Sequence, residues 1–226
     1  MVQHTGSILL SAIVAILLSG CDRAPDKPGA TPEPQTATSP STAEKRIRPV
    51  KPSPPIVAAA RAQIGRTVTY DGAYVGLEYP MGDVPMDRGV CTDVVVRALR
   101  VAINADLQKL VHEDMKSDFS AYPKIWGLRK PDRNIDHRRV PNLMRFFERK
   151  GCSLAVSRNK QDYRPGDIVT CKVENLPHIM IVSDRKNSSG VPLSIHNIGR
   201  GTVEVDALFE FPITGHYRIA RTARTN

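Results

Sequence analysis

Three side chains that are far apart in the sequence have the types and surroundings that a thiol nucleophile needs. Cys91 begins an apolar helical pattern just after Gly89, and His178 and His196 each lie in a strand-like segment nearer the C-terminus. A cysteine that attacks a carbonyl carbon needs a base to take its proton, and the base needs a third group to orient its other ring nitrogen. Such partners meet only in the folded chain, so their separation in sequence is no objection. The residues predict a Cys-His-polar site.

A helix that starts after Gly89 would position the cysteine. Apolar residues recur from Cys91 onward with helical spacing, which predicts a continuous inner face that includes the cysteine. Asp93, Arg97 and Arg100 fall on the other face, which we expect to meet solvent. The unpaired N–H groups and partial positive charge at a helix N-terminus favour a thiolate, so we expect Cys91 to be nucleophilic near neutral pH. The competing interpretation is a small buried apolar residue.

The strand that begins at His178 would carry the base. From residue 164 the apolar period changes to two, with a turn at 165–167 before a strand over 168–173. In the next strand His178 shares a face with Met180 and Val182, and we expect this row to face the apolar surface where helices pack.

The third residue of the site is left open between two neighbours in the following strand. His196 and Asn197 point to opposite faces of that strand, and a slip of one residue in register would exchange them. Either could orient His178. Because helical patterns fill the first half and antiparallel strands the second, the fold class is α+β.

Candidate substrate contacts lie on both sides of the Cys91 helix. Tyr70, Tyr74 and Tyr79 precede it and either line a cleft or are buried and hydrogen-bonded, which is commoner. The polar loop from 120 to 140 follows it and has no regular period, a type of segment that often carries function. Its basic residues suit a carboxylate-rich substrate, although we favour their pairing with nearby aspartates. The candidates are Tyr79, Asp93, His137, Arg138 and Arg139.

The remaining histidines and cysteines are interpreted as structural. His112 lacks the second histidine of a His-Glu-x-x-His zinc pattern and is expected at the surface, and His216 is expected to be a packed or edge residue. Cys152 and Cys171 could form a disulfide in an oxidising compartment, a question that geometry decides. We expect neither a cofactor nor a metal.

The N-terminus carries an apolar run over 8–18 that ends in Leu18-Ser19-Gly20-Cys21, the right length for a signal peptide and too short to span a membrane. It resembles a bacterial lipoprotein signal, although residues 1–7 contain no Lys or Arg. The resemblance implies that Cys21 carries lipid and anchors the protein on the periplasmic side of a membrane. In enterobacterial lipoproteins Asp22 implies the inner membrane, with the outer membrane as the alternative.

Four segments are therefore expected: a signal peptide over 1–20, a tether over 21–55, a folded domain over 56–221 and a frayed basic tail over 222–226. Nine of the eighteen prolines lie between residues 22 and 55, with few large apolar residues, so this stretch should not bury a core. The net charge of +9 suits an anionic partner such as cell-wall polymer or lipid headgroups, or no partner at all. Nucleic acid is not expected, because the chain has no zinc-ligand spacing or interleaved aromatic residues. We expect a monomer.

Several motifs carry a family resemblance. Those that contain Cys91 (89–93), His137 (136–142), His196 (195–199) and His216 (212–217) resemble the bacterial family named domain of unknown function 1287, over nearly all of 56–217. More distantly, Cys91, the segment 165–169, His178-Ile179-Met180-Ile181-Val182-Ser183 and Ser194-Ile195-His196 resemble the NlpC-type, papain-fold cell-wall cysteine hydrolases. The sequence departs from that pattern at Val90, Thr92 and Asp93, where those enzymes usually carry Asp, Ser and Gly.

The resemblance implies a papain-like fold and specific roles. Cys91 would be the nucleophile, His178 the general base and then acid, and His196 the orienting residue, with backbone N–H groups near Cys91 binding the oxyanion. The implied substrate is an amide in the peptide part of the cell wall or another envelope amide. The alternatives are an acyl or amide transferase on the same fold and a non-catalytic envelope protein that binds peptide or lipid.

Overall fold

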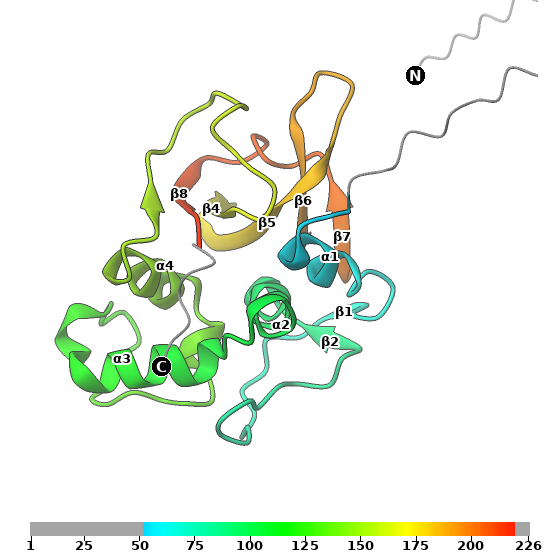
Figure 1. The fold of residues 1–226 in the computed structure, drawn as a ribbon. Coiled ribbons are helices and arrows are strands. Elements are labelled where there is room, and N and C mark those ends of the chain that lie inside the picture. The colour runs from blue at the N-terminus through cyan, green and yellow to red at the C-terminus, as the bar shows by residue number, and fades with distance from the viewer. Residues whose placement is uncertain (1–51, 220–226) are drawn as a thin grey trace, which may run out of the picture. The chain divides into compact units, whose positions relative to one another are not determined.

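The computed structural model describes residues 52–219, in which helices come first and the main sheet follows (Figure 1). The helices are α1 (Pro55–Arg61), α2 (Cys91–Ile103), α3 (Leu107–Ser117) and α4 (Val140–Arg149), with the paired short strands β1 (Thr69–Tyr70) and β2 (Arg88–Gly89) between α1 and α2. The later strands are β3 (Ser153–Leu154), β4 (Ile168–Val173), β5 (Leu176–Lys186), β6 (Pro192–Asn197), β7 (Thr202–Val205) and β8 (Ile213–Tyr217). The expected α+β class is confirmed.

The six later strands form one sheet in the order β3-β8-β4-β5-β6-β7, and every neighbouring pair is antiparallel. Across β4 and β5, Cys171 lies opposite His178. The hairpin between β5 and β6 closes where the N–H of Asn187 donates to the carbonyl of Val191 at 2.9 Å. This pairing brings the strand of His178 beside the strand of His196.

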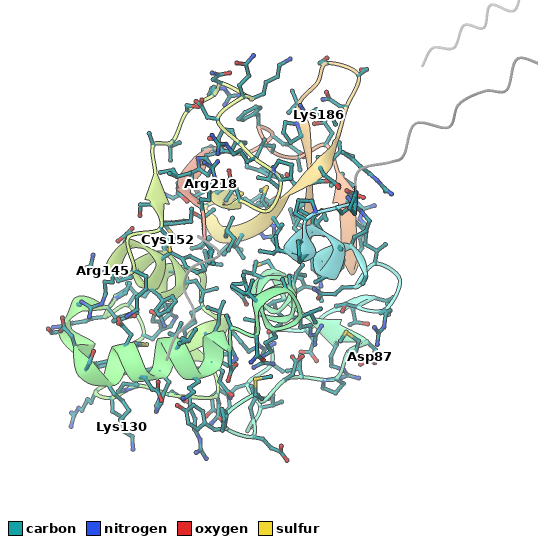
Figure 2. The ribbon with its side chains drawn as sticks, viewed as in Figure 1. Asp87, Lys130, Arg145, Cys152, Lys186 and Arg218 are labelled. Carbon is teal, nitrogen blue, oxygen red and sulfur yellow. The ribbon has the colours of Figure 1, made fainter. Side chains whose placement is uncertain are left out.

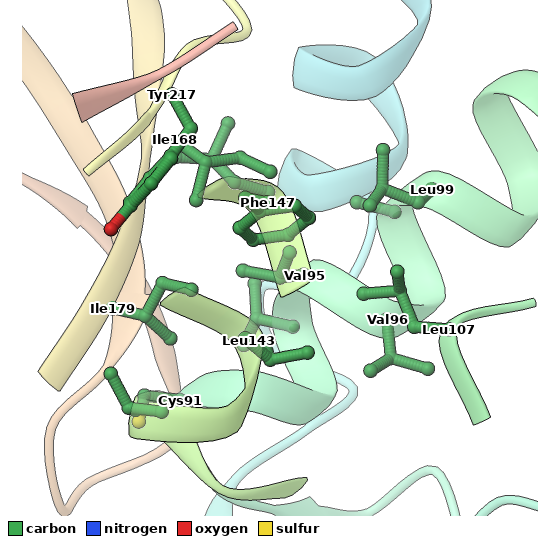
Figure 3. Packing of buried hydrophobic residues seen from close by; sticks show 14 of the residues in the cluster. Cys91, Val95, Val96, Leu99, Leu107, Leu143, Phe147, Ile168, Ile179 and Tyr217 are labelled. Carbon is green, nitrogen blue, oxygen red and sulfur yellow. The ribbon is translucent and has the colours of Figure 1, made fainter. Parts of the chain in front are cut away.

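The two faces of the sheet have different partners. Ile179 and Ile181 of β5 pack with residues of the helices in the main core, which Figure 3 shows in part. Met180 and Val182 belong instead to a second cluster made of strand and loop residues, including Leu208. The expectation that the row of His178, Met180 and Val182 faces the helices is therefore wrong. Side chains from loops cover this second face of the sheet. The alternation of apolar residues along a strand does not show which face the helices cover.

Helix α2 begins at Cys91, as predicted, but is enclosed on more sides than its pattern suggests. Asp93 and Arg97 are only 2% and 4% exposed, so the expectation that their face meets solvent is wrong. The segment before α2 covers this face. The Arg97 guanidinium donates to the Asp83 carboxylate at 2.8 Å and to the carbonyl of Arg88 at 3.1 Å. A buried arginine is tolerated because its donors are paired in this way.

The other helix ends follow local rules. The Asp106 carboxylate accepts a hydrogen bond from the N–H of Gln108 at 3.2 Å and so caps α3. Helix α4 has Pro141 in its first turn, where no intrahelical N–H bond is lost.

Within residues 52–219, no helix combines the length and apolar character needed to cross a membrane. The expected signal peptide, the lipidation site Cys21, nearly all of the tether and the basic tail lie outside the described residues.

Candidate active site

The sulfur of Cys91 lies where the start of α2 meets the start of β5. Cys91 is 4% exposed and lies at the edge of the core beside Ile179 (Figure 3). The backbone N–H groups of Ile179 and Thr92 and the hydroxyl of Tyr70 lie near its sulfur and favour the thiolate. Because Ile179 directly follows His178, the thiol contacts the backbone next to the predicted base.

The two histidines of the predicted site are in direct contact. Nε2 of His178 lies 2.8 Å from Nδ1 of His196, and their rings meet edge to face with centroids 5.0 Å apart. Both are buried, at 4% and 1% exposure. This contact occupies Nε2 of His178, so Nδ1 is the ring nitrogen that remains to accept the proton of a nucleophile.

Asn197, the alternative third residue, has other partners. Its side-chain amide donates to the carbonyl of Gly89 at 2.9 Å, and its Oδ1 accepts from the N–H groups of Gly199 and Gly201 at 3.2 Å each. Asn197 thus ties the turn after β6 to the residues just before Cys91. Of the two alternatives, His196 is the residue that contacts His178; the catalytic roles remain predictions.

The protonation states of Cys91, His178 and His196 follow mainly from burial. Burial raises the pKa of the Cys91 thiol to about 11, and the hydrogen bonds to the sulfur act in the opposite direction. Burial, with a smaller contribution from His196, lowers the pKa of His178 to about 3, and burial lowers the pKa of His196 to about 4. The expectation of a Cys91 thiolate near neutral pH is therefore wrong for the unliganded protein. Desolvation outweighs the favourable position at the helix start, and thiol and imidazole are both neutral.

A buried ion pair holds the start of α2. The Arg138 guanidinium donates to both oxygens of Asp93, at 2.9 and 3.0 Å, and Asp93 also accepts from the N–H of Val90 at 2.7 Å. Thr92 adds a hydrogen bond from its hydroxyl to the carbonyl of Arg138 at 3.1 Å. A Cβ on Gly89, whose φ is +154°, would lie 2.9 Å from an oxygen of Asp93. The residues around Cys91 that depart from the NlpC pattern are thus the ones that anchor this loop.

A cleft of about 290 Å³ opens onto Cys91. Its lining is mainly apolar and includes two arginines, and Tyr70 lies beside the cysteine. The Arg139 guanidinium lies over the Trp126 ring, 4.2 Å from its centroid, and also pairs with Asp136 at 3.2 Å. The lining residues are Tyr70, Gly72, Val90, Cys91, Ile125, Trp126, Ile135, Arg138, Arg139, Val140, Pro141 and Pro177.

The structure separates the five predicted substrate contacts. Arg138 and Arg139 line the Cys91 cleft, and Asp93 lies behind it as the partner of Arg138. His137 is buried, its Nδ1 has no partner among the described residues, and burial lowers its pKa to about 4. Tyr79 lies elsewhere, edge to face with His112 at a centroid distance of 5.3 Å.

The contact of Tyr70 with the sulfur and the roles of Ile125 and Pro177 as lining residues could not be predicted. The presence of tyrosines before the helix and of Trp126 in an irregular loop was the only signal. Tyr70, Ile125 and Pro177 meet at one cleft because the segments around α2 fold back on it. The local pattern of apolar residues in a sequence carries no information about such contacts.

The remaining cysteines and histidines have structural surroundings. Cys91, Cys152 and Cys171 are all free thiols, so the open question of a disulfide between the last two is answered in the negative. His216 is buried, with Nε2 2.8 Å from the Asp167 carboxylate, which matches the expected packed residue. No group of three or more His, Cys, Asp or Glu side chains within 52–219 is arranged to hold a metal ion.

The class of protein that fold and site define is an α+β domain with a buried cysteine at a helix start, near the backbone N–H of Ile179, which follows the first of two bonded histidines in the sheet. The chain belongs to the family described as domain of unknown function (DUF1287), whose model matches residues 57–219. The resemblance seen in the sequence motifs is thereby confirmed at the level of this family. The chain is also similar to a protein of Escherichia coli (strain K12) described as uncharacterized protein YijF. The two are 56% identical over 164 residues, which cover 72% of this chain and 80% of the relative.

Proposed function

We propose that this protein is a cysteine hydrolase that cleaves an amide bond in the peptide part of the bacterial cell wall. The observation that carries the proposal is a cleft lined by the buried Cys91, whose sulfur lies near the backbone N–H of Ile179. The residue before Ile179 is His178, which is paired with His196. The proposal assigns the roles of nucleophile, base and orienting group to Cys91, His178 and His196. The distant NlpC resemblance supplies the substrate class and the papain-like fold, both part of the proposal.

The reaction would start from a neutral thiol and a neutral imidazole. His178 takes the proton of the Cys91 thiol at Nδ1 as the sulfur attacks the carbonyl carbon of the amide, and the carbonyl oxygen becomes an oxyanion. Collapse of this intermediate breaks the carbon–nitrogen bond, and the leaving amine takes the proton from His178. Water, deprotonated by His178, then attacks the thioester and releases the acid and the free thiol.

Two groups could bind the oxyanion. The N–H of Cys91 is the first of α2, and N–H groups in the first turn of a helix have no intrahelical partner. The Tyr70 hydroxyl already contacts the sulfur from the cleft side. Both would donate to the oxygen as charge develops on it.

Acyl or amide transfer is a second candidate, favoured by the apolar lining of the cleft. Ile125, Val140 and Pro177 exclude water around a thioester on Cys91. An amine acceptor would then compete with water for the acyl group.

The test is digestion of purified cell-wall sacculi by the full chain, with the released fragments identified by mass spectrometry. We expect new peptide termini from the wild type and from Cys152→Ala, and none from Cys91→Ala. An added amine that appears in the products would instead establish transfer. If no variant releases or modifies fragments, a binding role should replace the proposal.

We further propose that the protein is an exported lipoprotein anchored through Cys21, with the inner membrane favoured by Asp22. The support is the Leu-Ser-Gly-Cys motif after the apolar run. Metabolic labelling with an alkyne fatty acid should mark the wild type and not Cys21→Ser. Equal labelling of both would contradict the anchor.

A further inference from the structure

A second cleft, of about 890 Å³, lies on the other side of the loop that borders the Cys91 cleft. Three exposed cations line it, Arg129, Lys130 and Arg133, and Figure 2 shows Lys130 on the outside of the molecule. None of the ion pairs formed among residues 52–219 includes these three. The other lining residues are His112, Gly127, Leu128, Pro131, Asp132 and Asn134.

Asp132, the one acidic residue that lines this cleft, forms hydrogen bonds within the loop and to Tyr74. The Asp132 carboxylate accepts from the hydroxyl of Tyr74 at 3.0 Å and from the N–H of Asn134 at 2.9 Å. The three cations therefore surround a concave surface with no carboxylate bound to them. Such a surface concentrates anions.

The Tyr79 ring fixes one of the cations. The Arg133 guanidinium lies 5.7 Å from the centroid of the Tyr79 ring, a position that orients it while its N–H groups stay available. His112 packs against the same ring, and its buried Nδ1 has no hydrogen-bond partner within the described part of the chain. A guanidinium held in this way can donate to a phosphate or carboxylate group.

The loop 126–135 separates the basic cleft from the Cys91 cleft, and at each end of this loop two consecutive residues line different clefts. Trp126 lines the Cys91 cleft, and the next residue, Gly127, lines the basic cleft. At the other end of the loop, Asn134 lines the basic cleft and Ile135 the Cys91 cleft. A substrate that crosses this loop would reach both.

We infer that the basic cleft binds an anionic group, phosphate or carboxylate, of the same molecule whose amide Cys91 attacks. The identity of that molecule as a substrate rests on the proposed function, whereas anion binding by Arg129, Lys130 and Arg133 does not. The site would select substrates with negative charge beyond the scissile bond.

The test uses the full chain carrying Cys91→Ala, so that binding is measured without hydrolysis. Trp126 is the only tryptophan and lies in the shared loop, so its fluorescence reports occupancy. Pyrophosphate and citrate serve as the phosphate and carboxylate probes in separate titrations. The site variant adds Arg129→Gln, Lys130→Gln and Arg133→Gln. The matched control adds Arg66→Gln, Lys160→Gln and Lys186→Gln, which removes the same charge from exposed positions, and Figure 2 shows Lys186 on the hairpin far from Lys130.

We expect at least one probe to bind saturably, with the site variant weakened by roughly tenfold or more, since each charge-assisted contact accounts for about that factor. The control should bind within about twofold of the Cys91→Ala parent. The probe that binds tells whether the group is a phosphate or a carboxylate. Absence of saturable binding, or equal weakening in both triple variants, would overturn the inference. The sacculus digestion, which does not use this variant, tests the proposed function separately.

Discussion

Nε2 of His178 lies 2.8 Å from Nδ1 of His196, and this contact couples the tautomers of the two rings, since one nitrogen must donate and the other accept. If Nδ1 of His178 is to accept a proton from Cys91, its Nε2 must carry a hydrogen and donate to Nδ1 of His196. The hydrogen of His196 then lies on Nε2, which is buried without a partner among the described residues. His196 can therefore stabilise His178 as it becomes an imidazolium, and it selects the reactive tautomer beforehand.

The first prediction concerns this contact. His196→Ala should lower kcat by between about 10² and 10⁴, because His178 loses the acceptor that sets its tautomer. The measurement is the rate of fragment release from sacculi. Ser194→Ala is the matched control, because Ser194 precedes His196 on the same face of β6 and its buried hydroxyl has no partner within 52–219. Equal activity of the two variants would remove His196 from the mechanism.

The second prediction concerns Cys91 itself. Because burial raises the pKa of its thiol to about 11, alkylation by iodoacetamide should be slow at pH 6 and rise about tenfold per pH unit from pH 7 to 10. Mass spectrometry of the Cys91 peptide separates this rate from those of the other thiols. A rate that is already constant between pH 6 and 8 would mean that Cys91 and His178 exist as an ion pair, contrary to the neutral state described above.

The third prediction assigns a role to Tyr70. Tyr70→Phe should lower kcat by about 10- to 10³-fold if its hydroxyl donates to the oxyanion, since removal of one such donor typically has an effect near this size. The alkylation rate of Cys91 at pH 9 should change by much less, because a thiolate needs no oxyanion donor to react with iodoacetamide. A variant that loses both in equal measure would indicate that Tyr70 acts only on the sulfur.

Some of this site could be predicted from the sequence because it depends on local pattern. The apolar period after Gly89 gave the helix start at Cys91, and the switch to a period of two gave the strand that carries His178. The placement of His178 and His196 on two consecutive strands could also be predicted. The choice between His196 and Asn197 was not, because it depends on the register between β5 and β6 and on a contact from Asn197 to Gly89 across 108 positions of sequence.

The errors share a physical cause. The pattern predicts that Asp93 and Arg97 face solvent, because a helix with charged residues on one side usually lies at a surface. Here the segment before α2 folds over that side and pairs Arg97 with Asp83, and Arg138 from the loop after α3 pairs Asp93. The thiolate at Cys91 was expected for a similar reason, since helix position is visible in a sequence and depth of burial is not.

The fourth prediction concerns stability in acid. Burial lowers the pKa values of His137, His178 and His196 to about 4, 3 and 4, whereas in the unfolded chain each would titrate near its ordinary value of about 6.5. Below that value the unfolded state binds more protons than the folded state, so the free energy of unfolding falls as the pH decreases from about 6.5 towards 4.

Near pH 5 the expected slope is about 1.4 kcal/mol per pH unit for each of these histidines. Urea unfolding at pH 5.0 to 6.0 measures the slope. His137→Leu, which removes one buried histidine outside the candidate site, should reduce the slope by about a third. An unchanged slope would show that His137 is not neutral in the folded protein.

The last prediction concerns the buried pair of Asp93 and Arg138 behind Cys91. Arg138→Met should lower the free energy of unfolding by about 3–5 kcal/mol, because it leaves the Asp93 carboxylate buried without its cation. Lys109→Met, at the exposed Lys109–Glu113 pair, should cost about 1 kcal/mol or less. Adding Asp93→Asn to Arg138→Met should restore part of the loss, because a neutral side chain can still accept from the N–H of Val90. Urea unfolding at pH 7 measures all three. If the double variant is as unstable as Arg138→Met alone, the loss comes from packing of the guanidinium and not from the unpaired charge that the geometry at the start of α2 implies.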